Sequence, residues 1–269
     1  MNGFLIDLDG TLYRGHDPIP YAKEFIELLN RRELPYLLVT NNSSRTPQQV
    51  AEHLKGLGME VSADAVYTSS QAAAHYMAQQ QSGRRVHMIG EAGLQIALEA
   101  AGFLLSEETP DYVVQGIDRS FSYAKLTDAV RHIKGGATYV LTNPDHLLPS
   151  DGGLMPGAGS IAASIRTATG VEPVVIGKPS PIIMAYAIER LGLPADQVWV
   201  IGDNAATDIR GGAMAGCLTA LVLTGVATAD NVQEQLALAG VTPDLVCDNL
   251  RSFALQLIPD CETDFASRP

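Results

Sequence analysis

The chain has 269 residues, 46% of them apolar, which fits one large or two modest globular domains with ordinary cores. Its 18 basic and 30 acidic side chains give a net charge of −12, which argues against general nucleic-acid binding but still allows a phosphate-bearing small molecule. The 3 cysteines lack paired or metal-ligand spacing, and the first strand leaves no room for a signal peptide. No apolar stretch approaches the roughly 20 residues that cross a bilayer. We therefore expect a soluble cytoplasmic protein with no membrane contact.

The first predicted strand, residues 4–6, is a short apolar run that breaks into Asp7-Leu8-Asp9-Gly10. Side chains alternate along a strand, so both carboxylates would project the same way if the strand ran on, and Gly10 is well suited to turning the chain. As an isolated pattern this is common in turns. Two carboxylates held together nevertheless repel each other and lose hydration, which is costly without a cation or a chemical use.

Predicted strands and helices then alternate up to residue 80. The second strand ends in Thr40-Asn41-Asn42, a hydroxyl followed by two amides. This alternation predicts parallel strands joined by right-handed crossovers. We expect helices at 18–32, 46–58 and 70–80, and strands at 36–40 and 65–67.

A polar run at residues 79–83 marks a predicted domain boundary. Beyond it, three further strand–helix units can bury a core of their own. We therefore predict an α/β cap domain at 82–173, inserted between core segments 1–81 and 174–269. The cap strands are expected at 86–89, 112–114 and 138–141, and its helices at 92–101, 123–133 and 159–169.

The core is expected to resume at Val174 with a strand that leads into Gly177-Lys178-Pro179-Ser180. A later strand leads into Gly202-Asp203-Asn204, and Asp208 follows five residues after Asp203. The predicted core is therefore a Rossmann-like, doubly wound parallel sheet, and the polar tail 261–269 is expected to fray. The remaining helices are expected at 181–191, 208–215 and 230–239, and the remaining strands at 198–201, 218–223 and 245–246.

The four motifs, Asp-x-Asp-Gly-Thr, Thr-Asn-Asn, Gly-Lys-Pro-Ser and Gly-Asp-Asn-x-x-Thr-Asp, stand in this order along the chain. The ordered set resembles the haloacid dehalogenase-like phosphatase superfamily, in its branch of NagD-type and p-nitrophenyl phosphatase-type enzymes. The resemblance covers nearly the whole chain. It implies a core with an inserted C2-type α/β cap, and a phosphatase that acts on small phosphorylated metabolites such as nucleotide, sugar or aryl phosphates.

Four of the motif residues are acids: Asp7, Asp9, Asp203 and Asp208. Parallel α/β sheets bind ligands beyond the carboxyl ends of their strands, so these motifs can converge. Together with a phosphate they need more positive charge than one lysine supplies, and oxygen ligands without His or Cys favour Mg²⁺.

Roles follow for these acids. Asp7 is the expected nucleophile, forming an aspartyl-phosphate, and ligates Mg²⁺ through its second oxygen. Asp9 is the expected acid and base, and the resemblance makes its backbone carbonyl a metal ligand. Asp203 would ligate the metal, while Asp208 would hold a water on it. Taken singly, Asp208 could equally be a helix cap.

The remaining core motif residues would act on the phosphate. Thr40, Asn41 and Asn42 would donate hydrogen bonds to phosphoryl oxygens, and Lys178 would neutralise charge on Asp7 and the transferring group. Taken singly, the first three could form an ordinary turn and the lysine could lie in a solvated loop. Finding all the motifs in the required order makes those interpretations weak.

Substrate choice is expected to lie in the cap, at Asn143, Asp145 and His146, in a loop that resembles the one facing the active site in relatives. An exposed surface histidine is the alternative for His146.

Two other functions stay open: a mutase-type phosphotransferase with the same intermediate, and a silent binding protein on this fold. The sequence is also compatible with a homodimer.

Overall fold

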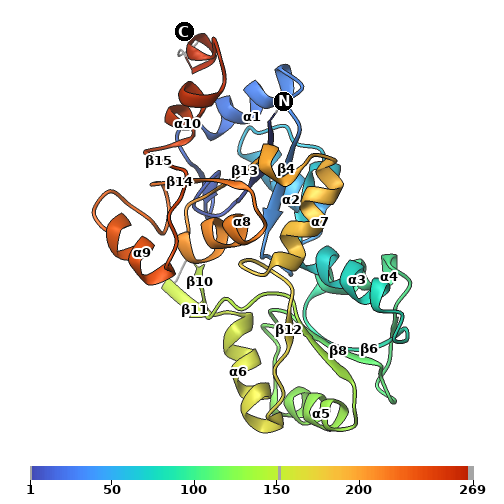
Figure 1. The fold of residues 1–269 in the computed structure, drawn as a ribbon. Helices are drawn as coiled ribbons and strands as arrows, with labels where there is room; N and C mark the ends of the chain where they lie inside the picture. The colour runs from blue at the N-terminus through green and yellow to red at the C-terminus, as the bar shows by residue number, and fades with distance from the viewer. Residues whose placement is uncertain (1, 151–152, 266–269) are drawn as a thin grey trace. The chain divides into compact units, whose positions relative to one another are not determined.

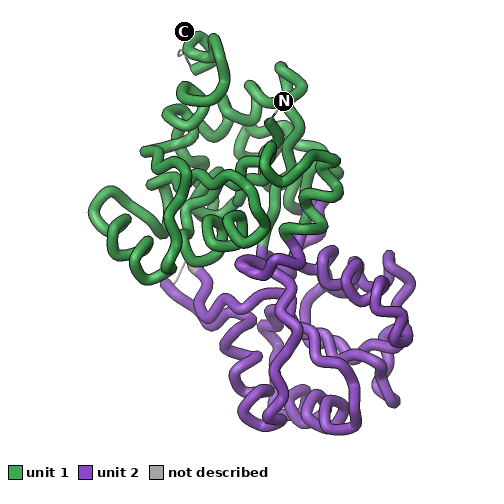
Figure 2. The backbone as a smooth tube through the Cα atoms, in the orientation of Figure 1, with its two compact units in different colours: residues 1–40, 50–67, 184–269 green, residues 41–49, 68–183 purple. Residues whose placement is uncertain are grey.

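The structure is a computed structural model that describes residues 2–150 and 153–265. The chain packs into two compact units, shown in Figure 2. Unit 1 comprises Met1–Thr40, Val50–Tyr67 and Met184–Pro269, and unit 2 comprises Asn41–Gln49 and Thr68–Ile183. The predicted bounds of the inserted domain, 82–173, stay a prediction. Across the described ranges, none of the helices has the length and apolar character needed to cross a membrane.

Unit 1 is built on a six-stranded sheet in the order β15-β14-β13-β1-β4-β5 (Figure 1). The pairings from β15 across to β4 are all parallel. From β1 the chain proceeds to β4 and β5 on one side, whereas β14 and β15 follow β13 on the other, so the order reverses between β1 and β13. Ligand sites of open α/β sheets form at such a point. The strands are Gly3–Ile6 (β1), Tyr36–Thr40 (β4), Val66–Thr68 (β5), Val198–Gly202 (β13), Leu218–Val222 (β14) and Leu245–Cys247 (β15).

Helices cover both faces of this sheet. On one face, α1 (Ala22–Arg31) and α10 (Leu250–Leu257) pack side by side. The rings of Phe4, Phe25 and Phe253 meet edge to face there, with centroids 6.0 to 6.4 Å apart. On the other face lie α7 (Pro181–Leu191), whose last residue lies against Gly3, and α8 (Arg210–Met214), which packs on β14. The remaining elements outside the second sheet are β2 (Tyr13–Arg14), β3 (Asp17–Pro18), α2 (Pro47–Gly56), α9 (Val232–Ala239), the 3-10 turns Ala63–Ala65, Ala195–Gln197 and Glu262–Phe265, and the π-helix η3 (Ala205–Ile209).

Unit 2 has its own five-stranded parallel sheet, in the order β12-β9-β8-β6-β7. Val113 faces α5 and α6, where it packs in one apolar cluster with Ile133 and Ile165. The adjacent Tyr112 points to the opposite face, and its hydroxyl donates to the Met77 carbonyl of α3 at 3.4 Å. The elements are β6 (Arg85–Ile89), β7 (Leu104–Leu105), β8 (Tyr112–Gln115), β9 (Thr138–Leu141), β12 (Val174–Val175), the hairpin β10 (Leu147–Ser150) and β11 (Gly153–Pro156), α3 (Ser69–Gln80), α4 (Ala92–Ala100), α5 (Tyr123–Lys134) and α6 (Ala158–Thr169).

The predicted fold class is confirmed: both sheets are parallel and carry helices on two faces. The structure differs at β12: the sequence predicts this strand in the core, whereas it pairs with β9 of the cap sheet. A two-residue apolar strand carries no local signal that says which sheet edge it will extend. β7, the β10–β11 hairpin and α10 were not predicted at all. The helix expected at 208–215 begins earlier, as the π-helical turn η3.

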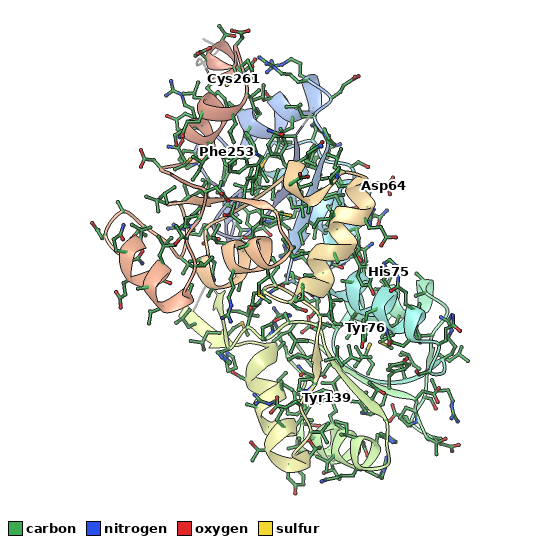
Figure 3. The ribbon with its side chains drawn as sticks, viewed as in Figure 1. Asp64, His75, Tyr76, Tyr139, Phe253 and Cys261 are labelled. Atoms are coloured by element: carbon green, nitrogen blue, oxygen red, sulfur yellow. The ribbon has the colours of Figure 1, made fainter. Side chains whose placement is uncertain are left out.

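The predicted fraying of the tail is wrong for residues 261–265. Cys261 and Phe265 are buried in the core of unit 1, and Cys261 lies at the end of that unit beyond Phe253 (Figure 3). Arg31 and Arg32 of unit 1 pair with Asp264 at 2.6 and 3.1 Å. The segment is mostly polar, but Cys261 and Phe265, four residues apart, bury their side chains and hold it on the core. Residues 266–269 lie outside the described residues.

Candidate active site

Three of the predicted acids form a close group at the switch point of unit 1. Asp7 follows β1 directly, Asp203 follows the neighbouring strand β13, and Asp208 lies in η3. One carboxylate oxygen of each lies within 4.8 Å of the others. Asp203 and Asp208 are 2% and 1% exposed, and Asp7 is half-buried. Three ionised carboxylates at this distance repel strongly in a buried setting, so the arrangement favours a bound cation.

Backbone N–H groups orient the two buried acids. The Val226 N–H donates to Asp203 Oδ2 at 2.5 Å, and the Ala227 N–H donates to the Asp203 carbonyl at 2.9 Å. The Asn204 N–H donates to Asp208 Oδ2 at 3.2 Å. These bonds hold the two carboxylates in place.

Two glycines leave room for Asp203. A Cβ atom on Gly10, whose φ is +85°, would lie 2.3 Å from Asp203 Oδ2, and one on Gly225 would lie 1.9 Å from the same oxygen. Both positions therefore require glycine. Gly10 is a predicted turn, whereas the loop at 224–226 is not predicted from the sequence. The available signal was Thr224-Gly225 at the end of the strand that follows β13.

Asp9 lies outside the close group. Its side chain is exposed, and the Tyr13 hydroxyl donates to its Oδ2 at 3.4 Å. The backbone closes a tight turn here, because the Gly10 N–H donates to the Tyr13 carbonyl at 2.8 Å. Asp7 and Asp9 therefore have different surroundings although they stand two residues apart.

In unit 2, the Asn41 carboxamide binds two other predicted residues. Its Nδ2 donates to both carboxylate oxygens of Asp145 at 3.2 Å and to the Lys178 carbonyl at 3.0 Å. Its Oδ1 accepts from the Lys178 N–H at 2.8 Å. Asn143 Nδ2 in turn donates to the Asn41 carbonyl at 2.8 Å. Three motifs far apart in the sequence are thus joined through one side chain.

The other predicted residues have simpler settings. Thr40 is buried at the end of β4. The Asn42 carboxamide oxygen accepts from the N–H groups of Ser44 at 2.9 Å and Arg45 at 3.1 Å, which is turn chemistry. His146 is exposed, and its carbonyl accepts from the Gly157 N–H at 2.7 Å at the start of α6. Lys178 is buried.

The unit boundary runs between Thr40 and Asn41, so each unit holds part of the predicted set. The acidic group of unit 1 fits Mg²⁺: its donors are carboxylate oxygens, and no His or Cys is among them. Asp7, Asp9, Thr40, Asp203 and Asp208 belong to unit 1, and Asn41, Asn42, Asn143, Asp145, His146 and Lys178 belong to unit 2.

Comparison with known proteins gives matches over both ends of the chain. A haloacid dehalogenase-like hydrolase model matches residues 4–104, and a second HAD-hydrolase-like model matches residues 175–253. An acid sugar phosphatase of Staphylococcus aureus is 45% identical over 233 residues, which cover 86% of this chain and 90% of the relative.

Solved structures show the same likeness over almost the whole chain. A p-nitrophenyl phosphatase from Archaeoglobus fulgidus superimposes with a TM-score of 0.91 at 35% identity, covering 95% of this chain and 99% of that one. A glycerol phosphate phosphatase from Mycobacterium tuberculosis in complex with magnesium gives 0.86 at 39% identity, covering 93% of this chain and 75% of that one.

Proposed function

Because this chain belongs to the haloacid dehalogenase-like hydrolases, in the branch of NagD and the p-nitrophenyl phosphatases, we propose that it hydrolyses small phosphomonoesters through a covalent intermediate on Asp7. The observation that carries this proposal is the group of Asp7, Asp203 and Asp208 at the switch point of the sheet. Sugar, glycerol and aryl phosphates are the substrate classes named by the relatives.

The proposed metal is Mg²⁺, held by the carboxylates of Asp7 and Asp203 and by the backbone carbonyl of Asp9. Asp208 would orient a water on it. When bound, Mg²⁺ offsets the charge of the carboxylates and of the phosphate and polarises the phosphoryl group. A magnesium complex of a related phosphatase supports this choice.

In the proposed first step, an Asp7 oxygen forms a bond to phosphorus while the ester P–O bond breaks. Asp9, protonated, gives its proton to the departing alcohol oxygen. In the second step, water attacks the phosphorus of the acyl phosphate, the Asp9 carboxylate takes its proton, and inorganic phosphate leaves with Asp7 restored.

In both steps the phosphoryl oxygens would be stabilised by the charge of Lys178 and by hydrogen bonds from Thr40, Asn41 and Asn42. The Asn41 carboxamide bonds to the Lys178 backbone at both of its ends and to Asp145 through Nδ2 alone, which supports a second role in positioning Lys178. Asn143, Asp145 and His146 remain the proposed specificity residues.

The test is turnover by Asp7→Asn, which keeps the shape of the side chain and removes the nucleophile. We expect no measurable phosphate release and an unchanged unfolding midpoint. Asp196→Asn, an exposed acid in the same unit, is the matched control and should keep full activity. Activity of Asp7→Asn within tenfold of wild type would exclude the covalent mechanism.

The same assay tests the metal. Chelation should stop turnover by the wild-type protein and Mg²⁺ should restore it, whereas full activity in a verified metal-free sample would exclude Mg²⁺ dependence.

Adding sugar acceptors separates hydrolysis from transfer: a phosphatase releases inorganic phosphate, and a mutase places the phosphoryl group on a second hydroxyl.

A further inference from the structure

A second group of potential metal ligands lies inside unit 2, on residues that the proposed mechanism does not use. It consists of His87 on β6, His132 on α5 and Glu107 in the loop between β7 and β8. Figure 1 labels β6 and α5. One ligand atom from each residue lies within 4.8 Å of the other two.

The fold places the two histidines together. His87 stands two residues before Ile89 on β6, so the two side chains share one face of the sheet, and Ile89 packs in the cluster that contains Ala129 and Ile133 of α5. His87 therefore points to the α5 face of the sheet. His132 stands next to Ile133 in the last turn of α5, and the centroids of the two imidazole rings are 4.9 Å apart.

His87 is a buried polar side chain without a hydrogen bond. It is 4% exposed, and neither ring nitrogen makes a hydrogen bond to any residue in the described ranges. Nδ1 lies 3.2 Å from Glu107 Oε2, but this contact lacks hydrogen-bond geometry. A buried polar group without a hydrogen-bond partner is destabilising, so a ligand that binds the ring nitrogens would stabilise this position.

The geometry suits a divalent transition metal. Two imidazoles and one carboxylate are a known zinc ligand set, in which a further position stays open to solvent. Zinc bonds of about 2.0–2.1 Å place tetrahedral ligand atoms roughly 3.4 Å apart, close to the 3.2 Å between His87 Nδ1 and Glu107 Oε2. The Glu107 side chain is 79% exposed, so it can move to close the remaining distance and leaves the open position facing water.

The charges around the group are compatible with a cation. Burial, and then the neighbouring His87 and Arg131, lower the pKa of His132, and Asp128 and Glu107 oppose this shift. A metal binds the neutral form of an imidazole, which the lowered pKa favours. Arg131 is the opposing feature, with Nη2 3.5 Å from His132 Nε2. Its charge is already paired with Asp128 at 2.9 Å, and its side chain is largely exposed and can turn away.

We propose that His87, Glu107 and His132 form a zinc-type metal site that joins β6, the β7–β8 loop and α5 of the cap. This site is separate from the acidic group of unit 1, which has only oxygen donors. A soft-to-borderline metal prefers imidazole, whereas Mg²⁺ prefers carboxylates, so the two sites would select different metals. The proposal does not depend on the catalytic activity proposed above.

The experiment is a binding titration on the full chain, stripped of metal and then saturated with Mg²⁺ to occupy the acidic group. Co²⁺ is added first, because its visible absorption reports nitrogen and oxygen ligation in a low-coordinate site, and Zn²⁺ is then used to displace it. We expect one equivalent of Zn²⁺ to bind under these conditions.

Two exposed neighbours provide the matched variants. Glu107→Gln should weaken Zn²⁺ binding by about 10–100-fold or more. Substituting residues that only hydrogen-bond to metal ligands already causes a loss of that size. Glu108→Gln, next in the chain and outside the group, should bind as wild type does. His87→Gln and His132→Gln should abolish binding, and if either fails to fold, the Glu107→Gln and Glu108→Gln pair still decides.

Three results would overturn the proposal. One is no Zn²⁺ binding by the wild-type protein in saturating Mg²⁺. Another is equal affinity in Glu107→Gln and Glu108→Gln. The third is Zn²⁺ binding that survives Glu107→Gln but is lost in Asp203→Asn, which would place the ion in the acidic group instead.

Discussion

Asp7 and Asp9 show how two identical side chains two residues apart acquire different tasks. Asp7 belongs to the close group with Asp203 and Asp208, whereas Asp9 is exposed and contacts the Tyr13 hydroxyl. A nucleophile must be ionised and held, while an acid and base must exchange protons with substrate and water. The surroundings of the two acids match the two proposed roles.

This difference predicts a leaving-group effect for Asp9→Asn. A proton from Asp9 helps only a poor leaving group, such as the alkoxide of a sugar phosphate, whereas nitrophenolate leaves readily near neutral pH. We expect phosphoryl transfer to slow by about 10²–10⁴-fold for a sugar phosphate and far less for p-nitrophenyl phosphate. A burst of nitrophenol is also expected, because the phospho-enzyme loses its base.

Rapid-mix kinetics on both substrates measure the first step directly. Equal slowing on the two esters would show that Asp9 serves the metal or the turn at Gly10 and is not the acid. Tyr13→Phe removes the hydroxyl contact to Asp9 and keeps its carboxylate, so it should show neither the selective slowing nor the burst.

Asn41 is predicted to act by positioning. Its carboxamide bonds to both the N–H and the carbonyl of Lys178, so Asn41→Ala leaves the backbone of a buried lysine without these partners. A shift of about 1 Å in a catalytic group costs on the order of 10²-fold in rate. Steady-state kinetics should show a fall in kcat for all substrates, with Asn30→Ala, an exposed amide in unit 1, as the control. A rise in KM at constant kcat would mean that Asn41 only binds substrate.

At the scale of elements, α10 is a helix that was not predicted, although its buried residues Leu250, Phe253 and Ala254 recur at helical spacing. It spans Leu250–Leu257 and begins with a capping box, in which the Asn249 side chain accepts from the Ser252 N–H at 3.1 Å and Ser252 Oγ accepts from the Asn249 N–H at 3.1 Å. Serine at this position is a weaker sequence signal than the usual glutamate or glutamine. The helix matters because Phe253 completes the aromatic cluster of the core.

Asn249→Ala should therefore lower the free energy of unfolding by about 1 kcal/mol, the usual loss for an N-cap. Urea unfolding followed by circular dichroism measures it. Asn249→Ser, which keeps a capping oxygen, should lose much less. Equal loss in both variants would show that the side chain of Asn249 acts in some other way than as a cap.

At the scale of the whole molecule, each unit has an apolar core of its own. Leu28 is buried in the apolar core of unit 1, and Ile165 is buried between α6 and the sheet of unit 2. Truncating such residues to alanine typically costs about 2–5 kcal/mol. If the units open separately, the damage should stay within the unit that carries it.

Hydrogen exchange followed by mass spectrometry tests this expectation. Ile165→Ala should lower the protection of β6 and β8 and leave β1 and β13 protected, and Leu28→Ala should do the reverse. Equal loss of protection in both units from either substitution would mean that the chain unfolds as one cooperative body.

The sequence by itself determined the fold class, the order of the motifs and the strand ends on which Asp7, Thr40 and Asp203 lie. These features depend on local patterns: apolar runs of strand length, helix periodicity, and the polar residues that follow each strand. Parallel strands then imply that their carboxyl ends share one edge of the sheet. That is why the acidic group could be predicted before its geometry was known.

Only the tertiary structure decided which segments meet when they are far apart in the chain. It placed β12 on the cap sheet, buried Cys261 and Phe265, and set Val226 against Asp203. The same holds for the meeting of His87 with His132. Such contacts depend on which edge, face or loop lies nearest after folding. Packing and hydrogen bonding select the partner, and neither produces a periodic pattern in the sequence around the two residues.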